Sequence, residues 1–397
     1  MIDRLTLHNF KAFRDAALPL GPLTLLTGLN SSGKSSVLQA LALLRQSYEA
    51  GGLAASEYQP EARWGGLRLG VANQGFLLNG ELVGLGTGED VLHEDFAEDE
   101  ARIGLAVDEG PHRYGWTVEY DPEQNLLPLL DVDLPFTSEG RDRPAGPEAV
   151  APSFLTAPFQ YLHADRISPA EFYPRDHYAA IGRGFLGVRG EHTVNFLRHR
   201  HDARDEVPEG LLRHPGAESD LLLDQVAAWM GDLCPGVDIQ AHAIEGADAV
   251  RLSYGFQGTL GPTRRRRPTN VGFGLTYVLP IVVACLTARL GSLVLLENPE
   301  AHLHPQGQTR MAALAAAAAA QGAQVVMETH SDHVINGVRL AVKQGQLAPG
   351  QLALHYFRGD GTGVDVVSPQ IDTDGMLDQW PAGFFDELEN TLDQLIG

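Results

Sequence analysis

The spacing of apolar residues changes several times along the chain. Residues 2–10 alternate between apolar and polar side chains, as a half-buried strand does, and residues 23–28 form a denser apolar run that stops at a glycine. Residues 35–50 carry apolar side chains at helical spacing and end before a Gly-Gly pair. The pattern therefore predicts a strand, a glycine-containing loop and a helix near the N-terminus.

The middle of the chain is divided into shorter segments. Between residues 65 and 120, short strand-like segments are separated by Gly, Asn and Asp, which predicts a small antiparallel sheet. Residues 126–158 are rich in Pro, Gly and acidic residues and are predicted to form a loop. Residues 219–236 are predicted to form a helix, and residues 237–256 a pair of strands. Residues 183–200 show no clear period.

The last third of the chain alternates apolar strands with long helices. A very apolar helix is predicted over residues 272–291, and buried strands are predicted at residues 292–297 and 323–331, each followed by another helix. Such alternation favours a parallel α/β sheet. We therefore predict an α/β protein whose mixed sheet is flanked by helices, with a small antiparallel β subdomain and a compact insert.

Composition narrows the class of protein. The chain has 397 residues, long enough for two or three domains or for one elaborated domain, and 44% of them are hydrophobic. The formal net charge of -22 argues against a globally basic nucleic-acid binder, although a local basic patch can still bind phosphate. The N-terminus lacks a signal-peptide pattern and the longest apolar run is too short to cross a bilayer. We expect a cytoplasmic protein without membrane contact.

The loop after the first apolar strand carries a phosphate-binding pattern. Gly28, Gly33, Lys34 and Ser35 satisfy G-x-x-x-x-G-K-[ST] between a predicted strand and a predicted helix. In such a loop the backbone amides wrap the phosphates, the lysine reaches the β- and γ-phosphates, and the serine hydroxyl ligates Mg²⁺. ATP and Mg²⁺ are the expected ligands. The expected nucleotide-binding residues are Asn30, Ser31, Ser32, Gly33, Lys34, Ser35 and Ser36.

The strand at residues 292–297 ends in a carboxylate. Glu297 lies where the acid that organises Mg²⁺ is needed, at the carboxyl edge of a parallel sheet. The next position, where many such ATPases have a glutamate that activates water, is Asn298. An amide can orient water but cannot take its proton. Glu300 can replace that glutamate, or it can be an acid favoured by a helix N-terminus; the sequence leaves both open.

Histidines follow both of the C-terminal strands. His330 stands at the end of the second strand, and we predict that it contacts the γ-phosphate. The alternative is a packed, hydrogen-bonded histidine. His302, His304 and His333 suggest a metal site, but H-x-H on a turn is not a good ligand geometry by itself, so none is predicted.

A basic segment precedes the apolar helix. The four arginines at residues 264–267 can bind phosphate of a nucleotide or nucleic acid, or they can form a solvated basic loop. Just after them, Asn270, Gly272 and Gly274 place backbone amides at the start of a helix, which suits an anion.

In this order the motifs resemble those of an ABC-type ATPase head. The segments are “LHNFKAF”, “LTLLTGLNSSGKSS”, “NVGFGLTYVLPIVVA”, “LLENPEAHLHP” and “METHSDHVINGVRLAV”. They are similar to the RecF/SMC/OLD-like branch of P-loop NTPases, and specifically to bacterial stand-alone AAA ATPases. The resemblance implies that Glu297 is the Walker B acid and His330 the switch histidine. Gln74 is the candidate for the glutamine loop.

The resemblance also implies an assembly. Two heads would pair head to tail as a homodimer and sandwich two nucleotides, with the phosphate loop of one protomer facing the signature segment of the other. Here that signature is Asn270, Val271 and Gly272, with Asn270 in place of the usual serine, and Gly274 follows it. No sustained heptad run separates the two halves. We expect half-heads at residues 1–125 and 263–370, an insert at residues 126–262 in place of coiled-coil arms, and an acidic, aromatic tail at residues 371–397.

Two functions follow from these expectations. The first is a dimerising switch that binds ATP, hydrolyses it slowly, and controls a separately encoded effector, for example in phage defence. The second is an ATP-regulated scaffold or DNA-binding module in DNA repair with little intrinsic hydrolysis. OLD nucleases carry a C-terminal Toprim domain, but the residues after Ser331 are too few to form one, so nuclease activity is not expected.

Overall fold

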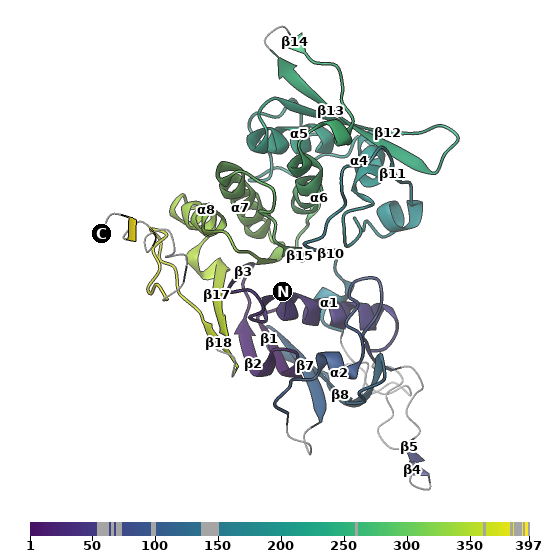
Figure 1. The fold of residues 1–397 in the computed structure, drawn as a ribbon, viewed down its shortest axis with the longest axis vertical. Coiled ribbons are helices and arrows are strands. Elements are labelled where there is room, and N and C mark those ends of the chain that lie inside the picture. The colour runs from purple at the N-terminus through teal and green to yellow at the C-terminus, as the bar shows by residue number, and fades with distance from the viewer. Residues whose placement is uncertain are drawn as a thin grey trace, which may run out of the picture. The chain divides into compact units, whose positions relative to one another are not determined.

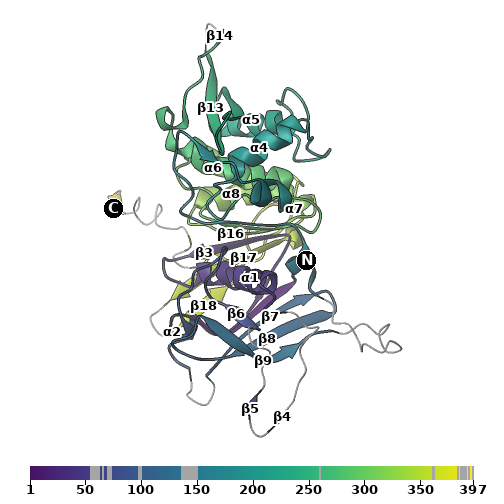
Figure 2. The ribbon, with the colours of Figure 1, turned by 90° about the vertical axis from the view of Figure 1, so that its right-hand side faces the viewer.

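The computed structural model describes residues 1–53, 63–64, 67–68, 74–96, 101–135, 151–258, 261–359, 363–381, 384, 391 and 394–395. The chain divides into two compact units (Figures 1 and 2). Unit 1 consists of Met1–Gly21, Leu29–Ala157 and Phe357–Asp365. Unit 2 consists of Pro22–Gly28, Pro158–Tyr356 and Val366–Gly397.

Unit 1 is built on an antiparallel sheet with the strand order β2-β1-β7-β8-β9-β6. The alternating pattern of β1 buries Leu5 and Leu7, and that of β8 buries Tyr114, Trp116 and Val118. The antiparallel sheet predicted between residues 65 and 120 is confirmed in β6, β7 and β8, whereas the strand expected at residues 66–71 lies largely outside the described residues. The strands are β1 (Arg4–Phe10), β2 (Phe13–Pro19), β6 (Gly75–Leu77), β7 (Arg102–Glu109), β8 (His112–Glu119) and β9 (Leu126–Asp133).

The predicted loop at residues 126–158 is wrong at both of its described ends. Strand β9 pairs with β8, and Ser153–Thr156 forms the one-turn helix α3. Of the eight residues in β9, only Leu127 is buried, so its polar and proline content marks an exposed sheet face and not a loop. Residues 136–150 lie outside the described part of the chain.

Helix α1 (Lys34–Glu49) follows the phosphate loop and packs within unit 1 through a buried glutamine. The Gln46 Nε2 group donates to the carbonyl of Leu77 at 2.7 Å, and its Oε1 accepts from the amides of Leu82 and Val83. These bonds tie α1 to β6 and to the turns before the short helix α2 (Gly88–Val91). Gln74 lies directly before β6, where its carbonyl accepts from the amide of Leu129.

Unit 2 contains the parallel sheet that the strand–helix alternation predicts. Strands β10 (Phe159–Leu162), β15 (Leu293–Glu297), β16 (Gln324–Glu328) and β3 (Leu23–Gly28) are parallel neighbours in that order, and β17 (Leu352–Gly359) and β18 (Val364–Val367) extend the sheet. The register places Glu297 opposite Glu328, and Glu328 opposite Leu26. The carboxyl ends of β15, β16 and β3 therefore meet at one edge.

Three long helices accompany this sheet, and they lie beside one another in both views (Figures 1 and 2). They are α6 (Phe273–Thr287), α7 (Pro305–Ala320) and α8 (Asp332–Lys343). A side chain at Gly337 would place a Cβ 2.7 Å from the Cβ of Ala312, so the small residues let α7 and α8 approach closely. Pro280 lies inside α6, and the helix continues past it. No helix in the described ranges is long and apolar enough to cross a bilayer.

The rest of unit 2 holds smaller elements. The predicted strand pair is confirmed as β12 (Val237–Ala243) and β13 (Ala249–Gly258), which carry the short partners β11 (Tyr173–Pro174) and β14 (Gly261–Pro262). The helix predicted at residues 219–236 is shorter, as α5 (Leu222–Leu233). Helix α4 (Thr193–Asp202) is not predicted from the sequence, because its second half alternates His and Arg and hides the apolar face of Val194 and Leu197.

Candidate functional site

The loop after β3 has the backbone geometry that a phosphate requires. Ser31 and Gly33 have φ values of 59° and 91°, in the left-handed region. A Cβ on Gly33 would lie 2.9 Å from the Cβ of Ala12 and from the ring of Phe13, so only glycine fits there. The first turn of α1 has no acidic residue and no side-chain cap. The absence of an acid and of a capping side chain at the positive end of the helix dipole suits an anion.

Lys34 folds back onto its own loop. The side chain is 2% exposed, and its Nζ donates to the carbonyl of Leu29 at 2.5 Å, which also accepts from the Ser32 hydroxyl at 2.7 Å. An ammonium group has three hydrogen-bond donors, and this bond uses one of them. Around this pair, Asn30 and Ser31 are exposed, Ser32 and Ser36 are buried, and Gly33 and Ser35 are half-buried.

Glu297 is the last residue of β15 and is held by its neighbours in unit 2. Its Oε1 accepts from the Tyr161 hydroxyl at 2.5 Å, and its Oε2 accepts from the amide of Ala164 at 2.9 Å. Burial, and after it the Glu297 carboxylate, raise the pKa of the Tyr161 hydroxyl well above its usual range, so Tyr161 remains a donor at neutral pH. Each carboxylate oxygen keeps a second lone pair for a cation.

Arg166 holds the main chain at the same strand end. Its Nη1 donates to the carbonyl of Glu297 at 2.7 Å, and its Nη2 donates to that of Asn298 at 2.8 Å. Burial lowers the pKa of Arg166 to about 10, which leaves the guanidinium charged at neutral pH. Sequence reasoning missed both Tyr161 and Arg166, which belong to β10 and to the turn that follows it.

The turn after β15 directs Glu300 inward. Asn298 has a φ of 43°, in the left-handed region, and its amide donates to the carbonyl of Glu328 at 3.0 Å. Glu300 is 8% exposed, and its Oε1 accepts from the amide of His330 at 2.7 Å. Its Oε2 is buried without a hydrogen-bond partner among the described residues. Burial raises the pKa of Glu300, although the His330 amide favours the charged form.

The structure argues against one of the two interpretations of Glu300, that of an acid at a helix N-terminus. Helix α7 begins only at Pro305, is capped by His304, and has no acid in its first turn. Glu300 is therefore not an acid that a helix N-terminus favours. Its nearest neighbours are instead the residues at the end of β16.

Strand β16 delivers a second acid and the predicted histidine. Glu328 is 6% exposed and in register with Glu297, and the sequence reasoning overlooked it although it ends a buried strand in the same way. His330 Nε2 lies 3.8 Å from Glu328 Oε1. The next residue, Ser331, caps α8 by accepting from the amide of Val334 at 3.2 Å. His330 therefore stands on a short turn between a buried strand and a capped helix.

The predicted signature residues lie at the start of α6. Asn270 ends the 3₁₀ turn η5 (Pro268–Asn270), and Gly272 is the N-cap of α6, whose first turn has no acid. A Cβ on Gly274 would lie 2.6 Å from the carbonyl oxygen of His302, so α6 and the turn after Glu300 pack closely. The three signature positions line a cavity of about 500 Å³ together with His302, Leu303 and His304.

Neither the arginine run at residues 264–267 nor the histidines considered for a metal site form a ligand-binding cluster among the described residues. Arg265 forms an ion pair with Asp238, and Arg267 forms one with Glu171. Arg264 and Arg266 have exposed side chains. In the described ranges, no group of three His, Cys, Asp or Glu side chains is arranged to hold a metal ion.

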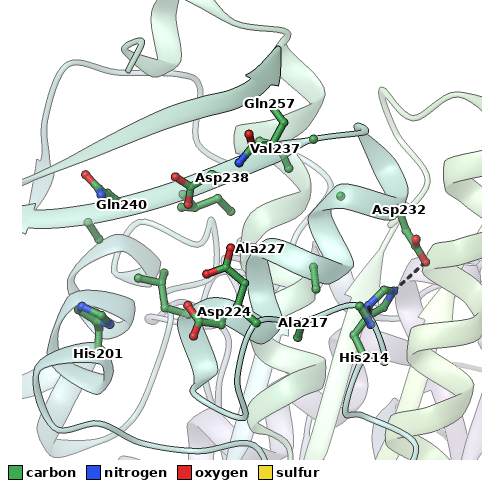
Figure 3. Close-up of a pocket in the computed structure, with 18 of the residues that line it drawn as sticks. His201, His214, Ala217, Asp224, Ala227, Asp232, Val237, Asp238, Gln240 and Gln257 are labelled. Atoms are coloured by element: carbon green, nitrogen blue, oxygen red, sulfur yellow. Dashed lines mark hydrogen bonds and ion pairs between the residues drawn. The ribbon is translucent and has the colours of Figure 1, made fainter. Parts of the chain in front are cut away.

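A cavity of about 600 Å³ lies elsewhere in unit 2, between α5, β12 and the loop before α5 (Figure 3). About half of its lining residues are polar, and of the predicted residues only Arg265 of the arginine run reaches it. His214 lies 3.4 Å from Asp232, and Arg265 pairs with Asp238. The predicted catalytic and phosphate-binding residues are not part of it.

The sequence also matches models of known protein families. A family model described as “AAA domain, putative AbiEii toxin, Type IV TA system” matches residues 23–336. The chain belongs to this AAA family. A second model, described as a protein of unknown function (DUF3696), matches residues 347–395 of this AAA protein. A stretch of 44 residues is 46% identical to an OLD nuclease of Thermus scotoductus. This stretch covers 11% of this chain and only 8% of that nuclease.

One solved structure shows the same fold. An SMC head bound to the C-winged helix domain of ScpA matches with a TM-score of 0.50 at 13% identity, over 93% of the AAA protein and 98% of that chain. The SMC head domain from Thermotoga maritima matches with a TM-score of 0.43 at 12% identity, over 93% and 99%. The first likeness confirms the predicted P-loop NTPase head, and the family match supports the SMC- and OLD-like type of ATPase domain.

Proposed function

We propose that this AAA protein binds ATP with Mg²⁺, hydrolyses it slowly, and uses the cycle as a dimerising switch. The observation that carries the proposal is the hydrogen bonding of the two carboxyl oxygens of Glu300. One of its oxygens is held by the amide of His330, and the other is buried without a hydrogen-bond partner among the described residues. It lies beyond the sheet edge at which β3 ends, and the peptide after Gly28 begins the phosphate loop.

The nucleotide-binding residues fit the chemistry of a magnesium–phosphate complex. The loop from Asn30 to Ser36 offers backbone amides, and Lys34 offers a buried ammonium group. Mg²⁺ prefers hydroxyl and carboxylate oxygens, and Ser35 and Glu297 supply these. When bound, the ion neutralises charge on the transferring phosphoryl group. Tyr161 and Ala164 hold the Glu297 carboxylate in one orientation, as partners of metal ligands do.

The residues after β15 and β16 are proposed to position and deprotonate water. Glu300 accepts the proton, because a carboxyl group whose pKa is raised towards neutrality is a stronger base than an ordinary one. Asn298 orients the water through its amide but cannot accept its proton. His330, two residues beyond the end of β16, contacts the γ-phosphate.

The switch is proposed to be a head-to-tail homodimer. Asn270, Gly272 and Gly274 would complete the site on the partner's nucleotide, and the acid-free first turn of α6 supports this, because it leaves free amides for an anion. One SMC head was solved with ScpA bound, and the matching family description names a toxin of a toxin–antitoxin system. By analogy, the effector would be a separately encoded protein, for example in phage defence.

The test is ATP binding and turnover by purified wild type, Lys34→Ala, Glu300→Gln and Asn298→Ala. We expect Lys34→Ala to lose ATP binding. Glu300→Gln should bind ATP but turn it over about 10²–10⁴-fold more slowly, the usual contribution of a general base. Asn298→Ala should lose less. Wild-type binding by Lys34→Ala would overturn the nucleotide site, and unchanged turnover by Glu300→Gln would remove Glu300 from the mechanism.

A second candidate function is an ATP-regulated scaffold or DNA-binding module, which Asn298 favours because it replaces a proton acceptor. The exposed Arg264 and Arg266 would then contact phosphates. Binding to duplex DNA that weakens steeply with salt, and that disappears in an Arg264→Gln/Arg266→Gln variant, would support this function. Arg265→Gln and Arg267→Gln are the controls, because these side chains are engaged in ion pairs.

A further inference from the structure

One buried guanidinium in unit 2 bonds to main-chain atoms of three separate segments. Arg166 is 2% exposed. Its Nη groups donate to the carbonyls of Glu297 and Asn298 after β15, and Nη1 also donates to the carbonyl of His163 at 2.7 Å. Its Nε donates to the carbonyl of Tyr277 in α6 at 3.1 Å. The planar fork of arginine allows this set, because a lysine has only three donors at one point.

The same guanidinium contacts the first of a series of touching rings, the ring stack, which meet edge to face or tilted and reach the start of α6. Its carbon lies 4.2 Å from the centre of the Tyr277 ring. The Tyr277 ring centre lies 4.9 Å from that of His302 and 5.4 Å from that of Phe273, and the latter two lie 4.7 Å apart. Phe273 is the first residue of α6 and follows the N-cap Gly272. The contacts thus run without interruption from the acid-bearing turn to the signature.

The backbone hydrogen bonds of α6 are interrupted near Tyr277, where Arg166 binds the helix. Pro280 has no N–H, so the carbonyl of Thr276 lacks its helical partner. The adjacent carbonyl of Tyr277 is the one that accepts from Arg166. Arg166 therefore adds an outside hydrogen bond to α6 beside the point where Pro280 interrupts the backbone ladder of the helix.

We propose that Arg166 is a positioning residue that couples the turn carrying Glu297–Glu300 to the signature at the start of α6. This rests on the proposed function. When a nucleotide binds, a shift of this turn displaces the Arg166 guanidinium. The contacting rings of Tyr277, His302 and Phe273 transmit that displacement to the signature segment. Nucleotide binding at one site then determines the conformation of the signature segment that contacts the nucleotide bound by the partner.

The variants for testing this coupling are Arg166→Lys and Tyr277→Leu. Tyr277→Phe keeps the ring stack and serves as the conservative rescue. Arg189→Lys is the matched control, because the Arg189 Nε contacts the carbonyl and the carboxylate of Asp165 and the side chain is 52% exposed. For each, one measures thermal melting, ATP affinity with a fluorescent ATP analogue, kcat, KM, and ATP-dependent dimerisation by light scattering.

We expect Arg166→Lys and Tyr277→Leu to keep ATP affinity within about threefold, to lose ATP-dependent dimerisation, and to lower kcat about 10–100-fold, the range seen when a partner of a site ligand is changed. Their effects should not add in the double variant, since both break one path. Tyr277→Phe and Arg189→Lys should behave as wild type.

Lower melting temperatures with unchanged kcat and unchanged dimerisation would assign Arg166 a structural role and overturn the coupling. So would additive effects in the double variant. If Arg166→Lys does not fold, the comparison of Tyr277→Leu with Tyr277→Phe decides alone. A wild-type protein that binds no ATP would instead overturn the proposed function, and the coupling with it.

Discussion

Two glutamates near one strand end differ in what surrounds their oxygens. Both oxygens of Glu297 accept hydrogen bonds, from Tyr161 and Ala164, whereas one oxygen of the buried Glu300 has no hydrogen-bond partner within the described residues. A carboxylate that is held and hydrogen-bonded suits a cation ligand, and one kept in a poorly solvated place suits a base. The division of roles between the two follows from their surroundings.

The first prediction at this scale concerns stability. Burial raises the pKa of Glu300 above its ordinary 4.5, so the folded protein holds this proton to higher pH than the unfolded chain does. The stability from this group is present below pH 4.5 and is lost as the pH rises through the folded pKa. Glu300→Gln should therefore melt at a higher temperature than wild type at pH 7, with the difference vanishing near pH 4. The exposed Glu245→Gln is the control, and equal melting at pH 7 would refute the prediction.

The same pKa shift predicts the pH dependence of turnover. A base works only when deprotonated, so kcat should fall on the acid side with a midpoint above the ordinary 4.5 of a glutamate. The residual turnover of Glu300→Gln should lack this acid limb. Measuring kcat between pH 4.5 and 8 for both proteins checks it, and an identical limb in the variant would assign the titration to another group.

A third prediction concerns the phosphate loop. Gly33→Ala should abolish ATP binding, because the added Cβ meets Ala12 and Phe13 at 2.9 Å and φ is 91°. Gly51→Ala is the matched control: φ is 78° there, but nothing lies within 4 Å of the added Cβ. It should lose about 1–2 kcal/mol of stability from the left-handed backbone while still binding ATP. Equal ATP affinity in the two variants would contradict the steric argument.

At the scale of elements, the sequence predicts strands and helices where a single period dominates. The strands β3, β15 and β16 are continuous apolar runs, and each is found where expected. Prediction fails where polar residues mask the period, as the His and Arg residues do in α4 and the proline and aspartates do in β9. An exposed face carries no requirement for apolar residues, so the pattern is lost while the element remains.

The candidate site is predictable to a similar extent. Lys34, Glu297 and His330 are found from motifs, because a local order of strand, loop and acid predicts them. Tyr161 and Arg166 cannot be found this way, since their partners at Glu297 and Asn298 are more than 130 residues away. One sequence contains no record of which distant segments meet. Glu328 is the exception, because it ends a buried strand as Glu297 does and the same argument selects it.

At the scale of the whole molecule, the proposed head-to-tail dimer makes a prediction about mixed protomers. Lys34→Ala and Gly272→Asp should each be inactive, the second because a carboxylate at the N-cap of α6 repels phosphate. Mixing them should restore part of the turnover, because one of the two shared sites then combines an intact loop with an intact signature. A mixture of Lys34→Ala with Glu300→Gln is the control, since both residues serve the same nucleotide. No recovery in the first mixture would exclude the sandwich arrangement.

The two compact units interleave in the sequence. The chain passes from one to the other after Gly21, Gly28, Ala157, Tyr356 and Asp365, so the strand β3 counts with one unit and the loop that follows it counts with the other. No continuous fragment contains one unit whole without residues of the other. Neither unit can therefore be moved into another gene as one continuous segment, and a protease cut between the first and last of these crossings leaves residues of each unit on both fragments.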